Sequence, residues 1–295
     1  MIMVDTVRII FPSSDGLLAD LRLAEEVRAI DTGTIRYRGY LNGFFVRIYP
    51  DGTASAQGSL PSLLWGSNTV MMRHADLQTA CCQLVELLGC QPERMVIKRL
   101  DVASTLSLPH PISQYLGILG PAPYLKRVWY ENESVIYRNR LRSLTFYDKA
   151  KESNTIGRLL RFEVQYKRRL EARFGQTVTI ASLSDTAFFY RLVHLWHDEY
   201  CAVEKVYRHA IGYFRTLTEL LKELARFALT ELGGERTLLP LIDDMRREFD
   251  LNRTEVHRLK KRIRDLAKSG NCGEDRELVH ELDHAMKSAV ADALS

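Results

Sequence analysis

A tyrosine and two carboxylates occupy matching positions in three short segments that alternate in the manner of β-strands. The segments are residues 96–106, 141–149 and 159–167. A strand sends successive side chains to opposite faces, so Asp101, Tyr147 and Glu163 can share one face of a sheet built from all three. Carboxylates near the middle of a sheet need charged or polar partners. This face therefore indicates a functional site.

The chemistry that such a face could perform is transfer of a phosphoryl group to tyrosine. A free phenol has a pKa of about 10 and is a poor nucleophile at neutral pH. A divalent cation and the ammonium group of Lys149 would favour the phenolate and neutralise a phosphate. Carboxylate oxygens suit Mg²⁺ or Mn²⁺, so we expect Asp101 and Glu163 to be metal ligands. Arg99 and Arg161 on the same face are expected to contact nucleic-acid phosphates.

Each of the three segments, taken alone, also fits an ordinary strand. Tyr-Asp-Lys at 147–149 is typical of a solvated edge, and Arg-Phe-Glu at 161–163 is typical of an amphipathic strand with a salt bridge. The presence of all three, with reactive groups able to share a face, favours the catalytic interpretation.

The elements that must position this face form an α+β pattern. Strand-like runs at 4–11 and 44–49 end in turn sequences, and 52–68 is typical of a strand followed by a loop. Apolar residues at helical spacing predict a helix over 76–88, with Gly89 past its end. Residues 126–130 and 135–138 can form a hairpin. We expect a mostly antiparallel sheet with one polar catalytic face, helices packed on the other face, and a helical C-terminal region.

The sequence changes character after residue 182. Ser184 can N-cap a helical stretch that continues to about residue 232, where Gly233-Gly234 breaks it, and 237–295 is again helical. We therefore expect three parts: a catalytic domain at 1–181, a helical extension at 182–234, and a small helical unit at 235–295.

Composition places the chain among ordinary globular proteins with a mild basic excess. Its 295 residues are 46% hydrophobic and 26% charged, with a formal net charge of +4. The stretch 126–173 alone has seven more Lys and Arg than Asp and Glu, so a nucleic-acid footprint is expected there.

Five cysteines without a Cys-x-x-Cys pair indicate neither a disulfide framework nor a zinc knuckle. No leader or membrane-spanning pattern is evident, and a reducing cytoplasm is the expected location.

The run 126–142 mixes cations with aromatic rings. Four arginines, which we take as candidate DNA contacts, are Arg127, Arg138, Arg140 and Arg142, and they are interleaved with Trp129, Tyr130 and Tyr137. Such a surface suits single-stranded nucleic acid. A plain β-hairpin with cross-strand aromatic pairs would look the same, and both readings stay open.

A basic helix with an apolar stripe lies in the C-terminal part. The stripe consists of Val256, Leu259, Ile263 and Leu266. With the helical stretch 238–249 before it, the segment could form a helix-turn-helix in which Lys261 and Arg264 contact DNA. The alternative is a helical hairpin with an ordinary solvated cationic face.

The three site segments resemble those of a known family. Their sequences are Ile-Lys-Arg-Leu-Asp at 97–101, Leu-Thr-Phe-Tyr-Asp-Lys at 144–149 and Leu-Arg-Phe-Glu at 160–163. The opening Val-Asp-Thr-Val-Arg, the His-Ala-Asp-Leu at 74–77 and the loop 58–68 fit as well. Over roughly residues 1–210 the chain resembles the gene II/X family of rolling-circle replication initiators of filamentous single-stranded DNA phages and related plasmids.

The resemblance implies a DNA nicking and closing enzyme acting in the bacterial host cytoplasm. Family members cut one strand of a double-stranded origin and keep the 5′ end as a phosphotyrosine, here at Tyr147, with Lys149 as its electrostatic helper. The free 3′-OH primes a host polymerase, and a second cleavage rejoins the displaced single strand. Asp101 and Glu163 would hold Mg²⁺ or Mn²⁺. The His-hydrophobe-His triplet of the larger class of rolling-circle nucleases is absent from this sequence.

Two other functions remain open. A tyrosine recombinase also forms a phosphotyrosine, but it attacks from a helical domain without metal, whereas Tyr147 lies in a strand pattern. A non-catalytic origin-binding or repressor protein would use Tyr147 only structurally. The C-terminal helices could read DNA or recruit a host helicase.

Overall fold

The structure is a computed structural model that describes most of the chain. The described residues are 1–13, 17, 22–28, 35–68, 70–130, 133–205, 216–231, 235–248, 251–268 and 272–295. They form two compact units. The first comprises Met1–Leu116, Pro121–Glu204 and Leu282–Ser295, and the second comprises Gly117–Gly120 and Lys205–Glu281.

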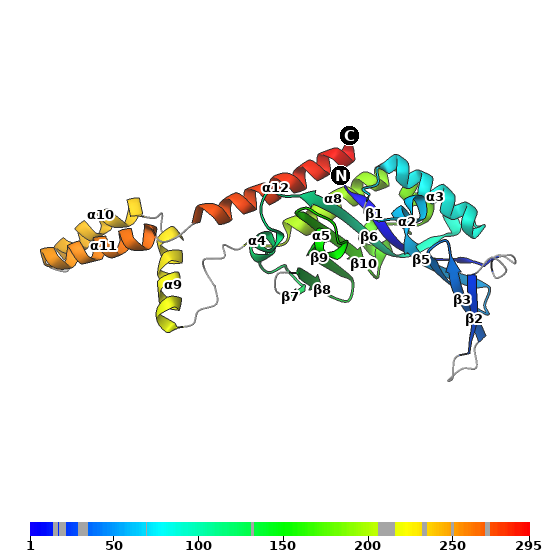
Figure 1. Ribbon diagram of the computed structural model, residues 1–295, viewed down its shortest axis with the longest axis horizontal. Coiled ribbons are helices and arrows are strands. Elements are labelled where there is room, and N and C mark those ends of the chain that lie inside the picture. The colour runs from blue at the N-terminus through cyan, green and yellow to red at the C-terminus, as the bar shows by residue number, and fades with distance from the viewer. Residues whose placement is uncertain are drawn as a thin grey trace. The chain divides into compact units, whose positions relative to one another are not determined.

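Ten strands among the described residues form one sheet, and every neighbouring pair in it is antiparallel (Figure 1). The strands are β1 (Met3–Pro12), β2 (Arg22–Arg28), β3 (Ile35–Leu41), β4 (Phe44–Ile48), β5 (Thr53–Ser59), β6 (Val96–Ser107), β7 (Lys126–Tyr130), β8 (Ser134–Arg138), β9 (Arg142–Asp148) and β10 (Leu159–Tyr166). Their order is β2-β3-β4-β5-β1-β6-β10-β9-β8-β7. The strands β6, β10 and β9, which carry Asp101, Glu163 and Tyr147, are therefore consecutive neighbours inside the sheet, and β1 lies on the other side of β6.

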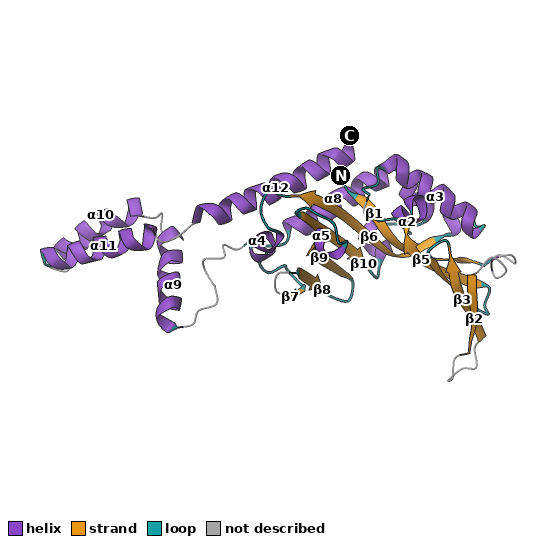
Figure 2. Ribbon diagram, in the orientation of Figure 1, coloured by secondary structure: helices purple, strands orange, loops and turns teal. Residues whose placement is uncertain are grey.

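Helices cover one face of this sheet (Figure 2). The helices of the first unit are α2 (Leu60–Trp65), α3 (His74–Leu88), α4 (Ile112–Gly117), α5 (Lys149–Glu152), α6 (Leu170–Phe174), α7 (Ile180–Ser184), α8 (Thr186–Cys201) and the C-terminal part of α12 (Cys272–Leu294), with a short 3₁₀ turn at Pro92–Arg94. The α8 helix packs on the centre of the sheet, where Phe162 of β10 lies between Phe146 and Trp196 with ring centroids 4.3 and 4.9 Å away. The apolar face of β9 and β10 is thus the core face, and the reactive side chains stand on the other.

Most of the expected elements are present. The helix over 76–88 is confirmed as α3, with Gly89 in the left-handed conformation at φ 60°. The hairpin of 126–130 and 135–138 is confirmed as β7 and β8. The α+β class, the antiparallel sheet and the helical C-terminal region are confirmed as well.

Three expectations about local structure were wrong. Residues 60–65, expected in a loop, form α2, because the Ser59 side chain accepts from Ser62 N and caps the helix. Asp185 rather than Ser184 caps α8, accepting from Ala187 N and Phe188 N. The helical stretch expected up to residue 232 is interrupted, since α8 ends at Cys201 and α9 (Leu217–Glu231) begins later, with residues 206–215 outside the described part. Strands β2 and β3 were not anticipated.

The observed units divide the chain differently from the three parts expected. The α8 helix belongs with the sheet rather than with a helical extension, and Leu282–Ser295 returns to the sheet unit as well. The Tyr200 hydroxyl of α8 donates to Asp283 Oδ1 at 2.5 Å and connects the second half of α12 to α8.

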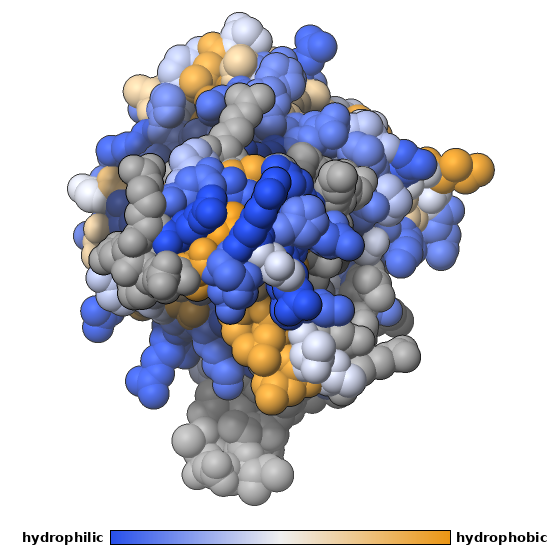
Figure 3. All heavy atoms as spheres, turned by 90° about the vertical axis from the view of Figure 1, so that its left-hand side faces the viewer, coloured by the Kyte–Doolittle hydropathy of each residue, from blue (hydrophilic) through white to orange (hydrophobic). Residues whose placement is uncertain are grey.

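The second unit is helical. It contains α9, α10 (Glu235–Glu248) and α11 (Arg253–Lys268). Lys260 Nζ lies 2.6 Å from Asp243 and links α11 to α10. Figure 3 shows the side of the molecule that lies at the left of Figure 1. The surface there is mostly hydrophilic, with apolar side chains between the hydrophilic ones. None of the helices in the described part of the chain combines the length and apolar character needed to cross a membrane.

Candidate functional site

Tyr147 and Arg161 stand side by side on the sheet. The β9–β10 register pairs them directly, and the same row continues to Ser134 of β8 and Thr105 of β6. Directly paired residues point to the same face and have Cβ atoms about 4.5–5.5 Å apart. The phenol and the guanidinium therefore emerge together on the face opposite to α8.

The next two rows carry the carboxylates. Glu163 pairs with Thr145 and Ala103, and Gln165 pairs with Ser143 and Asp101. Successive rows lie two residues apart along a strand, so all of these side chains point to the same side. The prediction that Asp101, Tyr147 and Glu163 share one face is confirmed.

Asp101 is almost fully buried and held by two neighbours. Arg99 Nε and Nη2 donate to its carboxylate at 2.9 and 2.5 Å, and Gln165 Nε2 donates to Oδ2 at 3.1 Å. Burial raises the pKa of Asp101, while the hydrogen bond and charge of Arg99 act in the opposite direction. Arg99, expected to contact DNA, thus serves first as the counter-ion of Asp101.

Asp5 is a third carboxylate of the site that the sequence analysis did not single out. A register irregularity between Val4 and Val7 of β1 sets Asp5 and Thr6 opposite a single residue, Asp101. Asp5 Oδ2 accepts from Arg161 Nη2 at 2.5 Å, and Oδ1 accepts from Ser59 Oγ at 3.0 Å. An aspartate inside the apolar run at residues 2–7 was the available signal.

The negative charges of Asp101 and Asp5 act on the carboxyl group of Glu163. Burial raises its pKa to about 7, and the charges of Asp101 and Asp5 push in the same direction, against Arg161 and Arg99. Perturbed pKa values cluster at functional sites, so the raised pKa of Glu163 beside a phenol supports this face as the candidate site.

Tyr147 is half-buried, and its phenol is protonated at neutral pH. Burial raises its pKa and outweighs the nearby positive charge of Arg161. Arg161 itself is completely buried, with Nη1 donating to the carbonyl of Asn68 at 3.3 Å. Its Nε has no hydrogen-bond partner among the described residues.

The other tyrosines of this region are less suited to react. Tyr137 and Tyr166 are buried on the core face, where Tyr137 packs against Phe146 and Tyr166 against Phe174. Tyr130 is exposed on β7, at the edge of the sheet. Tyr147 is therefore the tyrosine that combines partial access with charged neighbours.

Lys149 does not lie on the strand face, which corrects the expectation from sequence. Strand β9 ends at Asp148, whose side chain accepts from Lys151 N and caps α5, so Lys149 begins a helical turn. Its buried ammonium group is 2.5 Å from Glu152 Oε2. The cation that acts most strongly on the Tyr147 phenol is Arg161.

Two of the three carboxylates of the site, Asp101 and Asp5, are paired with arginines in the arrangement observed. Within the described part of the chain, no three His, Cys, Asp or Glu side chains come together as ligands of one ion. Asp101 and Asp5 each have an arginine at the position that a cation would take. An ion held by Asp101 and Glu163 would require Arg99 to leave the Asp101 carboxylate, and the assignment of both residues as ligands remains a proposal.

The arginines of the run 126–142 lie on different sides of the sheet. Arg142 points to the core face, where its Nε donates at 2.9 Å to the buried Glu199, so it is structural rather than an exposed DNA contact. Arg138 is exposed and belongs to the row of Ser143, Gln165 and Asp101 on the site face. Arg140 is exposed in the turn after β8, and the Arg127 guanidinium stacks over Trp129 at 5.0 Å.

Lys261 and Arg264 lie in the second unit, on α11, with both side chains exposed. The two helices α10 and α11 that the sequence predicted are present as an adjacent pair. Contact of Lys261 and Arg264 with DNA stays a prediction.

Comparisons with known proteins add little to this geometry. The chain matches no family model and no curated protein. Its fold is similar in part to a rolling circle replication initiator protein from Geobacillus stearothermophilus, at 10% identity and a TM-score of 0.39, over 74% of this chain and 89% of that one. It is also similar to TBP from Methanococcus jannaschii, at 10% identity and a TM-score of 0.31, over 58% of this chain and 91% of that one. Likenesses this distant carry no functional argument, which must come from the residues of the site.

Proposed function

We propose that the protein is a rolling-circle replication initiator that nicks DNA, with Tyr147 as the nucleophile that retains the 5′ end as a phosphotyrosine. The observation that carries the proposal is the pairing of Tyr147 with Arg161 on the face that also holds Glu163. A phenol beside a cation and a titratable carboxyl group has the neighbours that an attacking phenol needs. The collinear family motifs support the same assignment.

In the proposed step, the phenol oxygen of Tyr147 forms a bond to phosphorus while the bond between phosphorus and the 3′ oxygen breaks. The phenol proton passes to a base, and the departing 3′ oxygen gains a proton to become a hydroxyl group. One phosphodiester replaces another, so attack by a 3′-OH on the phosphotyrosine reverses the step and rejoins the strand without an external energy source.

Glu163 is the base that the geometry favours. It lies one row from Tyr147, and its pKa of about 7 means that a large fraction of it is a carboxylate at neutral pH. A general base works best when its pKa is near the working pH. Arg161 would stabilise the phenolate as it forms, because the two side chains are direct cross-strand neighbours.

Divalent metal remains part of the proposal as a requirement to be tested. Asp101 and Glu163 would hold the ion, and Arg99 would then have to release the Asp101 carboxylate. The ion would supply Lewis-acid stabilisation of the phosphate charge. In that case Glu163 would act as a ligand, and the pH and metal dependence of the reaction would distinguish its two roles.

The decisive experiment is a search for a covalent adduct that does not require knowledge of the origin. Purified full-length protein is incubated with single-stranded oligonucleotides of random sequence, labelled at either end, in Mg²⁺, Mn²⁺ or EDTA, and run on a denaturing gel. We expect the 3′ label to remain with the protein, since the fragment downstream of the cut keeps its 5′ phosphate on tyrosine. Mass spectrometry should find the nucleotide on tryptic peptide 143–149.

Tyr147→Phe should remove the adduct, and Tyr130→Phe should keep it. An adduct in Tyr147→Phe would overturn the assignment. Transfer of the 5′ label would contradict the proposed polarity. DNA binding without any adduct, in all metal conditions, would favour the non-catalytic origin-binding alternative.

A further inference from the structure

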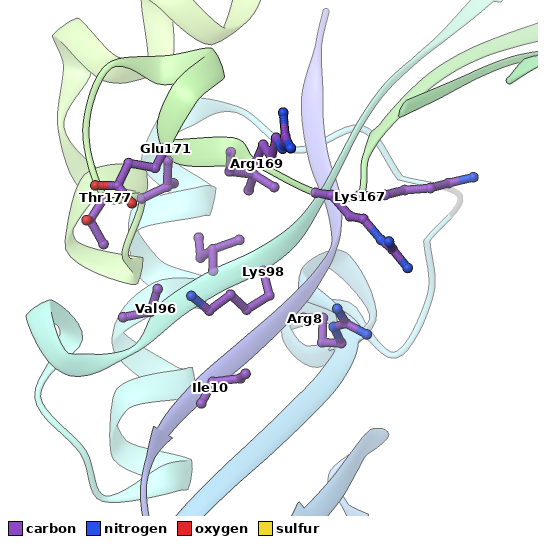
Figure 4. A pocket seen from close by; sticks show the side chains of 12 residues that line it. Arg8, Ile10, Val96, Lys98, Lys167, Arg169, Glu171 and Thr177 are labelled. Atoms are coloured by element: carbon purple, nitrogen blue, oxygen red, sulfur yellow. The ribbon is translucent and has the colours of Figure 1, made fainter. Parts of the chain in front are cut away.

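A cationic cavity lies at one end of the site face. It has a volume of about 370 Å³. Its charged lining consists of Arg8, Lys98, Lys167, Arg168 and Arg169, with Glu171 as the carboxylate. Figure 4 shows Arg8 and Lys98 on β1 and β6, and Lys167 and Arg169 on the segment that follows β10. Lys167, Arg168 and Arg169 belong to the basic stretch 126–173, whereas Arg8 and Lys98 were not expected beside it from the sequence.

The cavity exists because β10 is shorter than β6. The last pair between them is Tyr166 with Leu100, so β6 continues past the end of β10. There the backbone of Val178 takes the place of a strand, its carbonyl accepting from Ile97 N at 2.8 Å. A register shift makes Lys98 an extra residue of β6, because Arg8 pairs with Arg99 whereas Ile9 pairs with Ile97.

The cavity carries an excess of positive charge among the described residues, with five cations against the carboxylate of Glu171 in its lining. Within the described part of the chain, none of the five cations forms an ion pair with a carboxylate. Burial lowers the pKa of Lys167, and the positive charges of Arg99 and Arg138 lower it further, against Asp101. A concave site lined mostly by one sign of charge attracts ligands of the opposite sign.

Lys167 of the cavity lies in line with the row of side chains that leads to Tyr147. Lys167, the first residue after β10, continues the two-residue steps of Arg161, Glu163 and Gln165 along that strand. Six residues of strand span roughly 20 Å. About six phosphates of one strand of duplex DNA, at a spacing of 3.4 Å, would span that distance. An extended single strand of DNA would span it with fewer phosphates.

We propose that this cavity binds backbone phosphates of single-stranded DNA a few nucleotides away from the phosphate that Tyr147 attacks. The volume suits one strand rather than a duplex, since cavities of roughly 300–1,000 Å³ enclose small ligands. Apolar side chains of Ile10, Val96 and Leu170 in the same lining offer contacts to sugars and bases. The place of the cavity relative to the cut rests on the proposed function, whereas its binding of DNA does not.

The test is DNA binding in a cleavage-free background. In Tyr147→Phe protein, the affinity for a fluorescent 20-nucleotide oligothymidine is measured by anisotropy at several salt concentrations, with and without the double change Lys98→Glu and Lys167→Glu. We expect the double variant to bind at least about tenfold more weakly and to show a salt dependence shallower by about one to two phosphate contacts. Lys287→Glu, an exposed lysine on α12, is the matched control and should bind like its parent.

Unchanged affinity and salt dependence in the double variant, with an unchanged melting temperature, would overturn the proposal. Loss of folding is addressed by Lys98→Gln and Lys167→Gln, which remove the charge without reversing it and should give a smaller loss in the same direction. A larger loss for duplex than for single-stranded DNA of the same length would contradict the single-strand assignment.

The cavity and the nicking reaction can fail separately. Weakened DNA binding in the variants, together with no adduct in the unmodified protein, would support the cavity and contradict the nicking proposal. A normal adduct with unaltered binding in the variants would contradict the cavity alone.

Discussion

Arg161 lies directly opposite Tyr147 in the β9–β10 ladder, and its completely buried guanidinium is held 2.5 Å from Asp5 on β1. The pair connects strands that are not adjacent, because β6 runs between β1 and β10. Through Arg161, the position of the candidate nucleophile depends on a carboxylate more than 140 residues away in the sequence.

We expect Arg161→Met to destabilise the protein strongly. Removing one partner of a buried ion pair leaves the other charge uncompensated and typically costs about 3–5 kcal/mol. Urea unfolding followed by circular dichroism measures the loss. Arg140→Met, at an exposed turn position, should change the free energy of unfolding by no more than about 0.5 kcal/mol. A cost for Arg161→Met as small as that of the control would show that Asp5 does not need this partner.

The raised pKa of Glu163 predicts a pH-dependent contribution to stability. Because its pKa is about 7 in the folded protein and about 4.3 in an unfolded chain, the folded state holds a proton that the unfolded state has lost between these values. The contribution of this group is therefore fully present below about pH 4 and is lost as the pH rises through 7.

Glutamine does not titrate, so Glu163→Gln should not show the loss of stability between pH 4 and pH 7 that the carboxyl group causes. Melting temperatures in EDTA should show the variant gaining stability relative to the unmodified protein between pH 5 and pH 8. A difference that stays constant over this range would mean that Glu163 titrates normally. Adduct formation by the unmodified protein should rise over the same interval if Glu163 accepts the phenol proton.

The metal proposal predicts that Mn²⁺ stabilises the folded protein through Asp101. A ligand that binds only the folded state stabilises it by about 2.7 kcal/mol at a concentration 100 times its dissociation constant. The melting temperature should therefore rise with Mn²⁺ in the unmodified protein and remain unchanged in Asp101→Asn. An equal rise in both proteins would place any bound metal elsewhere.

Arg142 and Arg138 form a matched pair of tests for the two faces of the sheet. Arg142→Ala should destabilise the protein, because buried Glu199 would lose one of its two arginine partners among the described residues and keep Arg173, at 2.9 Å. It should leave DNA affinity per folded molecule unchanged. Arg138→Ala, on the exposed site face, should leave stability within about 0.5 kcal/mol and weaken DNA binding. Thermal unfolding and anisotropy at fixed salt measure both quantities. The reverse pattern would contradict the assignment of the faces.

The sequence by itself determined the alternation of the strands and therefore which side chains share a face. Tyr147, Glu163 and Asp101 were placed together on that basis, and the same rule sets Arg142 with Leu144 and Phe146 on the core face. Alternation is local, because it follows from the geometry of a single extended chain. The helix of 76–88 was equally evident, since its apolar spacing and Gly89 are local as well.

Only the tertiary structure decided which charges meet. Asp5 joins the site through an irregularity in the pairing of β1 with β6, and Lys149 leaves it because Asp148 caps a helical turn. The cavity of Lys98 and Lys167 forms because β6 extends beyond the end of β10. Each of these outcomes depends on where one strand ends or slips relative to its neighbour, and that register is fixed by contacts between segments far apart in the chain.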